Sequence, residues 1–283
     1  MRTALSQVAA LPITTRAAVL VDAGKPLALM ELQLPALQPE QALVKMAYAG
    51  ICHSQLNEVR GKKGKDAFLP HTLGHEGSGI VLATGPNTKK VKVGDAVALT
   101  WIKGEGAEVN TQNYACENLG KVNSGAISTF MEYTNICENR LVKIPENLNL
   151  RDAALLGCAL PTGGGMVQHH FKIDKNSTAA VFGCGGVGAC AIAVAALQGA
   201  KILIAIDRVA AKLETAKALG ATHIIDAARE DVAARLKEIA PNGVDLAVEA
   251  TGVPEVMEMA HTCVKTGGGL CVLAGVWWTT RPG

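Results

Sequence analysis

The stretch Thr178-Ala-Ala-Val-Phe-Gly-Cys-Gly-Gly-Val-Gly188 decides how the second half of this chain is interpreted. Its apolar beginning, which ends at Phe182, has the pattern of a buried strand and leads directly into a glycine-rich turn. The apolar segment Val187 to Leu197 is typical of a packed helix. Asp207 then ends the next apolar run, at the distance expected of a dinucleotide-binding strand–helix–strand unit. Strand, glycine turn, helix and acid agree, so a phosphate-binding turn is favoured over a turn that needs glycine for geometry alone.

The glycine turn predicts how a dinucleotide would be bound. Gly183 and Gly185 let the backbone turn and approach a pyrophosphate, and Gly188 lets the helix pack closely on the strand. The N-terminus of the helix offers N–H groups and a positive dipole end to the phosphates. Asp207 would accept hydrogen bonds from the adenosine ribose, which favours NAD over NADP, and Arg208 softens this preference. The predicted cofactor contacts are Gly183, Gly185, Gly186, Val187, Gly188, Asp207 and Arg208.

Apolar runs and helical segments alternate through the rest of this half. The expected strands are residues 179–182, 202–206, 223–225, 244–248 and 270–274, and the expected helices are residues 187–197, 210–219 and 231–239. Continuous apolar strands that alternate with helices predict a doubly wound parallel sheet, and therefore an α/β chain. We place this domain at residues 160–283.

Residues 1–159 have the pattern of a second, mostly-β domain. Strands separated by turns are expected at residues 16–21, 41–48, 79–83, 130–133 and 140–144. Residues 100–128 are polar and weakly periodic, so we expect a long loop or an irregular excursion there. The basic segment Gly61-Lys-Lys-Gly-Lys65 is predicted to be a solvated surface loop in preference to a phosphate site. Asn149 is expected to cap a short helix that leads to Gly157 and Cys158.

The composition limits the class of partner. With 283 residues, 49% of them hydrophobic, the chain is long enough for two domains with real cores. The formal net charge of +2 gives no reason to expect nucleic acid or an anionic membrane as a partner. No apolar stretch reaches the length of a membrane span. Residues 1–16 lack a secretory pattern, although two Arg and no acid before Asp22 leave a weak organelle-targeting alternative beside a frayed leader. Eight scattered Cys form no dense disulfide framework, so a reducing cytoplasm is the default.

Three residues of the first half have the chemistry of a shared metal site. Cys52 and Cys158 supply thiolates and His75 supplies an imidazole. Three such ligands with one open position are the pattern of a catalytic zinc. The three are far apart in the sequence, so spacing alone is weak support, and each by itself would be an ordinary packing residue. The sequence around each residue therefore decides between a metal site and ordinary packing.

These contexts resemble a known family. Gly50-Ile-Cys-His-Ser54 and Gly74-His-Glu-Gly-Ser-Gly79 are similar to the paired zinc-site signatures of zinc-containing medium-chain alcohol dehydrogenases. Gly157-Cys-Ala-Leu-Pro-Thr-Gly163 is similar to the segment that carries that family's third ligand. The glycine turn and Asp207 follow where the family has them. The resemblance covers residues 16–276, and its motifs are jointly specific.

The resemblance implies a GroES-like catalytic domain followed by a Rossmann domain, with substrate in the cleft between them. It implies a zinc- and NAD-dependent oxidoreductase that interconverts an alcohol and its aldehyde or ketone. Cys52, His75 and Cys158 would hold the zinc. Glu76 would lie behind the metal, where transient ligation and a hydrogen-bond-accepting role are equally open. Ser54 would pass on the hydroxyl proton, so the implied catalytic residues are Cys52, Ser54, His75 and Glu76.

The resemblance also implies further cofactor contacts. His53 would lie near the phosphates, Thr162 near the nicotinamide and Lys212 near the adenosine ribose. The remaining implied contacts are Ala274, Gly275 and Val276. The implied partners are a small alcohol or aldehyde and, as in relatives, further copies of the chain in a homo-oligomer.

The chain departs from the family pattern in three places. Family members often hold a second, structural zinc with four Cys, but only Cys116 lies between Asp95 and Ser128, so we expect a single catalytic zinc. Asn57 stands where many relatives carry a His that ends the proton relay. Asn does not titrate, so the proton would leave through water or His53. Relatives also continue past the strand at residues 270–274, so we expect an incomplete Rossmann domain, from a fragment, a truncated gene product or a variant that pairs otherwise.

Two alternatives compete with the dehydrogenase hypothesis. One is a zinc-free reductase of the same superfamily, against which the retention of Cys52, His75, Glu76 and Cys158 argues. The other is a degenerate relative that binds dinucleotide but performs no chemistry, which Asn57 and the short C-terminus favour. The side chain of the substrate cannot be read from the sequence.

Overall fold

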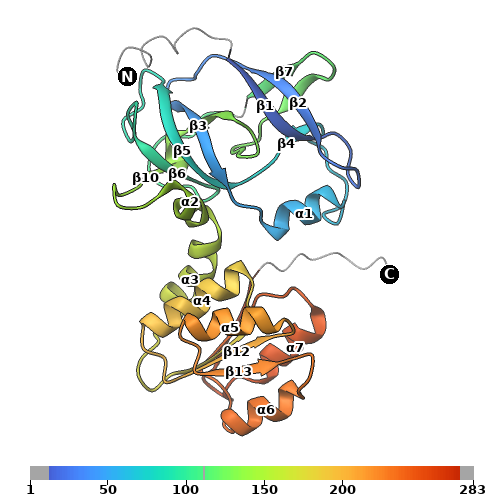
Figure 1. The fold of residues 1–283 in the computed structure, drawn as a ribbon, viewed down its shortest axis with the longest axis vertical. Coiled ribbons are helices and arrows are strands. Elements are labelled where there is room, and N and C mark those ends of the chain that lie inside the picture. The colour runs from blue at the N-terminus through green and yellow to red at the C-terminus, as the bar shows by residue number, and fades with distance from the viewer. Residues whose placement is uncertain (1–12, 111, 275–283) are drawn as a thin grey trace. The chain divides into compact units, whose positions relative to one another are not determined.

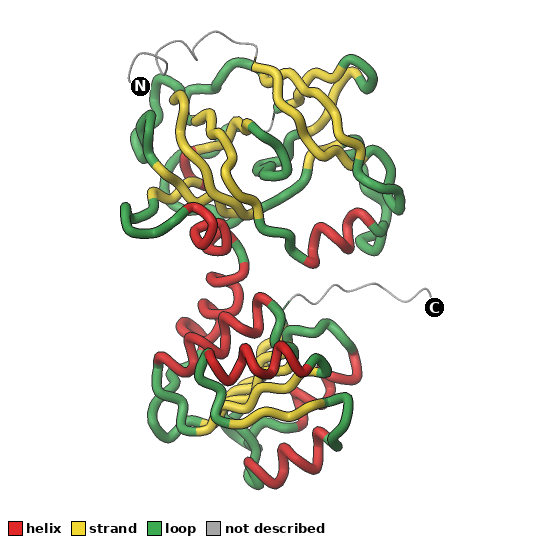
Figure 2. Tube along the Cα trace, viewed as in Figure 1, coloured by secondary structure: helices red, strands yellow, loops and turns green. Residues whose placement is uncertain are grey.

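The computed structural model describes residues 13–110 and 112–274. These residues divide into two compact units, the first ending at Cys158 and the second beginning at Ala159. Strands dominate the first unit, whereas strands and helices alternate in the second (Figure 1, Figure 2).

The first unit contains a closed barrel, ordered β1-β2-β7-β8-β4, and a five-stranded sheet, ordered β10-β6-β5-β3-β9. The barrel strands are β1 (Ile13–Leu20), β2 (Ala28–Leu34), β4 (His71–Thr72), β7 (Asn113–Cys116) and β8 (Gly120–Asn123). The sheet strands are β3 (Gln41–Ala49), β5 (Glu76–Thr84), β6 (Ala96–Thr100), β9 (Tyr133–Cys137) and β10 (Leu141–Lys143). The prediction of a mostly-β first domain is confirmed.

Alternation of side chains explains the barrel. In β2, Leu32 and Leu34 are buried while Gln33 between them is exposed, so one face of the strand fills the barrel core. The expectation of a long loop over residues 100–128 is wrong in its second half, because β7 and β8 form a hairpin there. Tyr114 and Val122 are buried cross-strand partners in it. Strands of four residues carry too few alternating positions to stand out in a sequence.

The first unit also contains short helices, two of which border the candidate metal ligands Cys52 and Cys158. They are α1 (His53–Val59), η1 (Glu138–Arg140), α2 (Leu150–Ala153) and η2 (Ala154–Gly157). Asn149 caps α2, since its side-chain oxygen accepts a hydrogen bond from the N–H of Asp152 at 2.9 Å. The predicted cap before Cys158 is therefore confirmed.

The second unit is a parallel five-stranded sheet with the order β13-β12-β11-β14-β15. Its strands are β11 (Thr178–Phe182), β12 (Ile202–Asp207), β13 (His223–Asp226), β14 (Leu246–Glu249) and β15 (Leu270–Leu273). Its helices are α3 (Ala159–His170), α4 (Gly186–Leu197), α5 (Ala210–Ala218), α6 (Val232–Ile239) and α7 (Pro254–Thr262). The prediction of a doubly wound parallel sheet is confirmed, and α3 and α7 are helices that the sequence did not predict.

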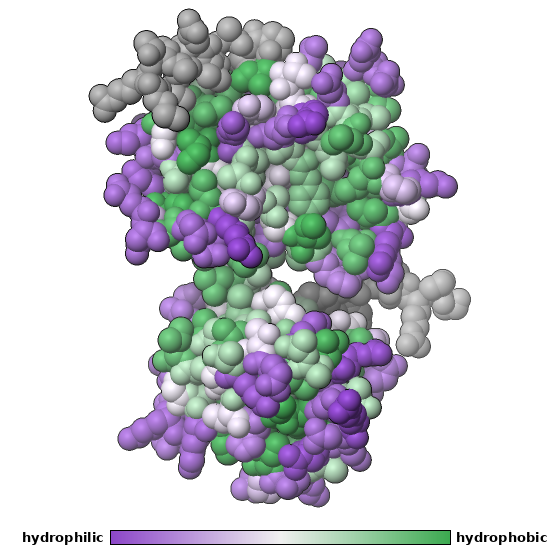
Figure 3. All heavy atoms as spheres, in the orientation of Figure 1, coloured by the Kyte–Doolittle hydropathy of each residue, from purple (hydrophilic) through white to green (hydrophobic). Residues whose placement is uncertain are grey.

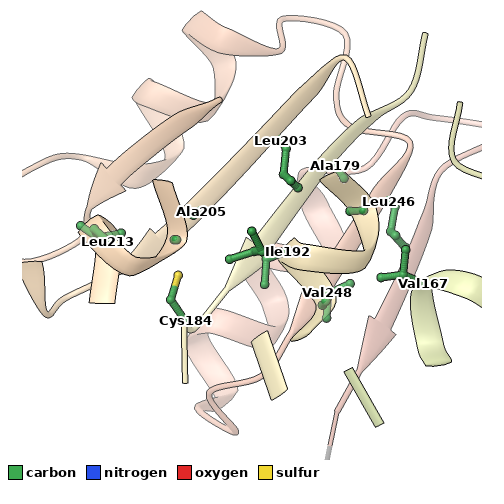
Figure 4. Close-up of a cluster of buried hydrophobic side chains, with 13 residues drawn as sticks. Val167, Ala179, Cys184, Ile192, Leu203, Ala205, Leu213, Leu246 and Val248 are labelled. Carbon is green, nitrogen blue, oxygen red and sulfur yellow. The ribbon is translucent and has the colours of Figure 1, made fainter. Parts of the chain in front are cut away.

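One core cluster of the second unit lies between the sheet and α4. Ile192 of α4 packs among Leu203 of β12 and Val248 of β14, and Val167 of α3 closes the same cluster (Figure 4). β11 is buried along its whole length, which is why its sequence reads as a continuous apolar run. This packing fixes the glycine turn between β11 and α4.

The surface mixes hydrophilic and hydrophobic side chains on the face of each unit shown in Figure 3. Among the described residues, none of the helices has the length and apolar character needed to cross a membrane.

Candidate active site

Three potential metal ligands converge within the first unit. One donor atom each from Cys52, His75 and Cys158 lies within 4.8 Å of the other two. Cys52 directly precedes α1, His75 directly precedes β5, and Cys158 directly follows η2. Residues more than a hundred positions apart therefore meet at one point, as the sequence predicted.

Two glycines position these ligands. Gly74, before His75, has a φ of +95°, and a Cβ there would come within 2.8 Å of Phe130 Cδ1. Gly157, before Cys158, accepts a hydrogen bond from the Thr100 hydroxyl at 2.7 Å. A Cβ on Gly157 would lie 2.7 Å from the Cβ of Glu76, so only glycine lets this segment approach β5.

Gln55 connects two of the three ligands and was missed by sequence reasoning. It is 5% exposed, and its side-chain oxygen accepts a hydrogen bond from the N–H of Cys52 at 3.3 Å. Its amide nitrogen is in hydrogen-bond contact with Nδ1 of His75. The signal available in the sequence was its position one helical turn after Cys52, which places its side chain near that ligand.

The other ring nitrogen of His75 has no partner. Nε2 is buried, and within the described part of the chain it makes no hydrogen bond. A buried polar atom without a partner is costly, so such an atom calls for a ligand. Together with two thiols, this nitrogen matches the sulfur and nitrogen donors that zinc prefers.

The electrostatics of the cluster favour a thiolate at Cys52. The neighbouring side chains of Cys158 and His75 lower the pKa of the Cys52 thiol to about 4, against the opposing effect of burial. A deprotonated sulfur is the form that binds a metal. The donor set therefore fits a zinc ion.

Glu76, Ser54 and His53 were also expected at this site, and each lies in a different environment. Glu76 is 3% exposed and lies against the backbone of Gly50, where the missing Cβ makes room for its side chain. Its carboxylate is not one of the donor atoms that lie mutually within 4.8 Å. Ser54 lines a pocket of about 350 Å³ together with His75, and His53 is exposed at the start of α1. The ligation of a metal by Glu76 stays a prediction.

Cys116 lies away from this cluster. It ends β7 in the barrel core, with its sulfur 3.8 Å from that of Met30. It serves there as a small apolar residue. The absence of a structural zinc stays a prediction.

The glycine turn of the second unit combines a strained backbone with open space. Gly183 has a φ of +88°. A Cβ on Gly188 would overlap the carbonyl oxygen of Gly183 and lie 3.3 Å from Val181 Cγ1, so the helix can sit this close only with glycine. A Cβ on Gly185, by contrast, would meet no described atom within 4 Å. Packing does not require that glycine, and space stays open before the first turn of α4, which fits a phosphate group.

Asp207 is built into the same turn. One carboxylate oxygen accepts a hydrogen bond from the N–H of Cys184 at 2.8 Å, and the other accepts one from the N–H of Val209 at 2.9 Å. Lys212 Nζ lies 3.9 Å from this carboxylate. Burial, and then the charge of Asp207, raise the pKa of the Cys184 thiol to about 12. A carboxylate has four acceptor positions, so Asp207 retains capacity for ribose hydroxyls.

The remaining expected cofactor residues are spread over the second unit. Arg208 is exposed, and Thr162 lies on α3. The N–H of Ala274 donates to the carbonyl of Glu249 at 2.7 Å, while Gly275 and Val276 lie outside the described residues. Glu249 is a fully buried carboxylate that accepts from the N–H of Thr251 at 2.6 Å and so shapes the turn after β14.

Comparisons with known proteins agree with this architecture. A family model for the alcohol dehydrogenase GroES-like domain matches residues 38–146, and one for zinc-binding dehydrogenases matches residues 186–282. The chain therefore belongs to the zinc-containing medium-chain alcohol dehydrogenase family, a family of oxidoreductases, with a GroES-like first domain and a Rossmann second domain.

Curated relatives point to the same class. The chain is 33% identical to a probable S-(hydroxymethyl)glutathione dehydrogenase 1 of Schizosaccharomyces pombe, over 92% of this chain and 76% of that protein. It is 31% identical to the alcohol dehydrogenase class-2 isozyme 2 of Oryctolagus cuniculus, over 93% of this chain and 77% of that protein. Among solved structures, the benzyl alcohol dehydrogenase of Acinetobacter calcoaceticus matches with a TM-score of 0.80 and 35% identity, covering 95% of this chain and 79% of that one.

Proposed function

We propose that this protein is a zinc- and NAD-dependent alcohol dehydrogenase that interconverts an alcohol and its aldehyde or ketone. The observation that carries the proposal is the buried Nε2 of His75, which has no hydrogen-bond partner among the described residues and shares a cluster with two thiols. A hydrophobic packing role would leave this nitrogen unsatisfied, whereas a metal site uses it.

Cys52, His75 and Cys158 would hold the zinc, and Gln55 would orient the first two of them. When bound, zinc acts as a Lewis acid that lowers the pKa of a hydroxyl group. Glu76, packed behind the cluster, would add negative charge close to the ligands. Ser54, one helical position after His53, would pass on the proton of the substrate hydroxyl.

The second unit would bind NAD. The amide groups at the start of α4 would face the pyrophosphate across the space that Gly185 leaves open. Asp207 would accept from the ribose hydroxyls and disfavour a 2′-phosphate by its charge. NAD supplies the hydride acceptor of the reaction. Asp207→Gly should shift the ratio of kcat/KM for NAD and NADP toward NADP, and an unchanged ratio would contradict Asp207 as the selector.

The substrate class is proposed from the relatives. Their names include an S-(hydroxymethyl)glutathione dehydrogenase and a benzyl alcohol dehydrogenase, so aliphatic, aromatic and thiol-adduct alcohols should all be screened. A cytoplasmic location and a homo-oligomeric state stay predictions.

One combined experiment tests the proposal. Elemental analysis of the purified protein should give one zinc per chain, and the alcohol screen should produce NADH. Alcohol oxidation by a protein that contains no zinc would favour the zinc-free reductase. NAD binding without NADH formation from any alcohol would favour the catalytically impaired relative.

A further inference from the structure

A chain of polar contacts leads away from the hydroxyl of Ser54. Nζ of Lys63 lies 3.3 Å from Ser54 Oγ and 2.7 Å from Glu58 Oε2, and donates a hydrogen bond to each. Ser54 and Glu58 are four residues apart on α1, so they share one face of that helix. Lys63 comes from the loop that follows α1, and it bridges Ser54 and Glu58. We call Glu58 and Lys63 the Glu58–Lys63 pair.

His71 and Asp66 continue the contacts from the pair. Nε2 of His71 lies 2.9 Å from Asp66 Oδ2 and 3.5 Å from Glu58 Oε1. Nδ1 of the same ring lies 2.9 Å from the carbonyl oxygen of Thr72. Both ring nitrogens thus face oxygen atoms. Although burial opposes it, the N–H of Phe68 and the ring of His71 lower the pKa of Asp66.

Each carboxylate of this group already has a partner. Glu58, Asp66 and His71 have donor atoms within 4.8 Å of one another, a geometry that also suits a metal ion. Lys63, however, forms an ion pair with Glu58, and Asp66 is in hydrogen-bond contact with His71. A metal would have to displace both partners. A hydrogen-bonded network for protons is therefore the better interpretation.

The network opens to water. Glu58, Lys63, Asp66 and His71 line the pocket of about 350 Å³ that also contains Ser54 and His75. The side chains of Lys63 and Glu58 are 24% and 22% exposed, so each is partly sheltered yet reaches solvent. Asn57, on the same helix, cannot accept or release a proton.

On the basis of the dehydrogenase function proposed above, we propose that the Glu58–Lys63 pair is the proton exit of this enzyme, in place of a relay histidine at Asn57. The pair connects the hydroxyl of Ser54 to the water of the pocket. His71, which contacts both Glu58 and Asp66, is a positioning residue for Glu58.

The proton moves from the substrate to water in balanced transfers. On oxidation, the substrate O–H bond breaks and its proton joins the Ser54 oxygen. In the same transfer the Ser54 proton joins Lys63 Nζ while Lys63 gives one of its own protons to Glu58, so the charge of Lys63 is unchanged and Glu58 forms a carboxylic O–H bond. Glu58 then releases this proton to water, and NAD would supply the acceptor for the hydride. Reduction runs the same steps backwards.

The decisive variant is Lys63→Arg. A guanidinium keeps the ion pair with Glu58 but does not release a proton, so a structural role survives the change and a relay does not. We expect kcat for alcohol oxidation near neutral pH to fall about ten- to a hundredfold. The loss should shrink at alkaline pH, where hydroxide takes the proton directly. Zinc content and NAD affinity should stay at the wild-type level.

Two further variants and a matched control complete the test. Glu58→Gln, which keeps the shape of the acceptor but cannot take a proton, should give the same altered pH profile. Lys63→Met should be partly rescued by added ethylamine. Lys62→Arg, an exposed lysine in the same loop, should retain the wild-type profile. The groups that face the pair, Ser54, His71, Asp66 and His75, are unchanged in all of them.

The outcomes separate the two proposals. An active, zinc-loaded wild type whose Lys63→Arg and Glu58→Gln variants keep its pH profile would overturn the proton exit alone. A wild type that oxidises no alcohol would overturn the dehydrogenase function and the exit with it. Loss at neutral pH, recovery at high pH and rescue by the amine would support the exit.

Discussion

The candidate metal site and the glycine turn are built in opposite ways. Cys52, His75 and Cys158 come from three distant segments, and the folded first unit alone brings them together. The glycine turn and Asp207 lie within thirty residues of one another, and their contacts are mostly local. A site assembled from distant residues depends on glycines such as Gly157, which let separate segments pack closely together. The geometry of a contiguous site is set mainly by the residues of its own motif.

The largest expected effect separates these two sites. Cys158→Ser removes one soft donor, so zinc content should drop sharply and kcat should fall about a thousandfold or more, since a Lewis acid supplies several kcal/mol to such a reaction. NAD affinity should not change. Metal analysis, steady-state kinetics and a fluorescence titration with NADH measure the three quantities. Cys271→Ser, a half-buried thiol outside the cluster, is the matched control. Wild-type zinc and kcat in Cys158→Ser would refute the ligand assignment.

The next effect compares two glycines within the turn. Gly188→Ala places a Cβ against the carbonyl of Gly183 and should lower the free energy of unfolding by about 2–3 kcal/mol. Gly185→Ala meets only open space, so the stability should stay within about 0.5 kcal/mol while NAD affinity falls. Denaturant unfolding and cofactor titration distinguish the two. Equal stability losses would show that the space before α4 is not reserved for a ligand.

A smaller effect concerns the residue between two ligands. Gln55→Ala removes contacts to Cys52 and His75, so zinc affinity should drop about ten- to a hundredfold. Competition with a chelating dye measures this change. Gln55→Glu offers His75 a carboxylate acceptor and should retain the metal. If the alanine variant binds zinc as tightly as the wild type, Gln55 does not orient the ligands.

The mildest effect compares two thiols over pH in the metal-free protein. The pKa of Cys52 is lowered to about 4 and that of Cys184 is raised to about 12. Because a lowered pKa in the folded state stabilises it above the unfolded value, the contribution of Cys52 is complete at alkaline pH and disappears as the pH falls through about 4. Iodoacetamide should therefore alkylate Cys52 at mildly acidic pH and leave Cys184 unmodified, as read by peptide mass mapping. Equal labelling of both would contradict these environments.

The contrast between the two sites also explains what the sequence could predict. The strands and helices around Phe182, Val187 and Asp207 were predicted within a few residues, because buried parallel strands have unbroken apolar runs. The three residues of the candidate metal site were proposed from their motifs, and the structure brings them together. The hairpin at Tyr114 was not, since four-residue strands leave little pattern.

Contacts made by folding were beyond the sequence. Gln55 is adjacent to His75 only because folding brings α1 to the residue that precedes β5, since twenty residues separate the two in the chain. Lys63 looked like one lysine of a solvated loop, and its bonds to Glu58 and Ser54 depend on how that loop folds back onto α1. Such pairings are set by tertiary packing rather than by any period in the sequence.

The two hydrogen bonds of Asp207 bear on any attempt to engineer the cofactor preference. The carboxylate that would discriminate between the ribose forms also holds the backbone at Cys184 and Val209. A designer who replaces it removes two acceptors that shape the turn, so selectivity and loop order cannot be tuned independently at this position. A successful swap would need a compensating acceptor from a neighbouring side chain before a positive charge is introduced.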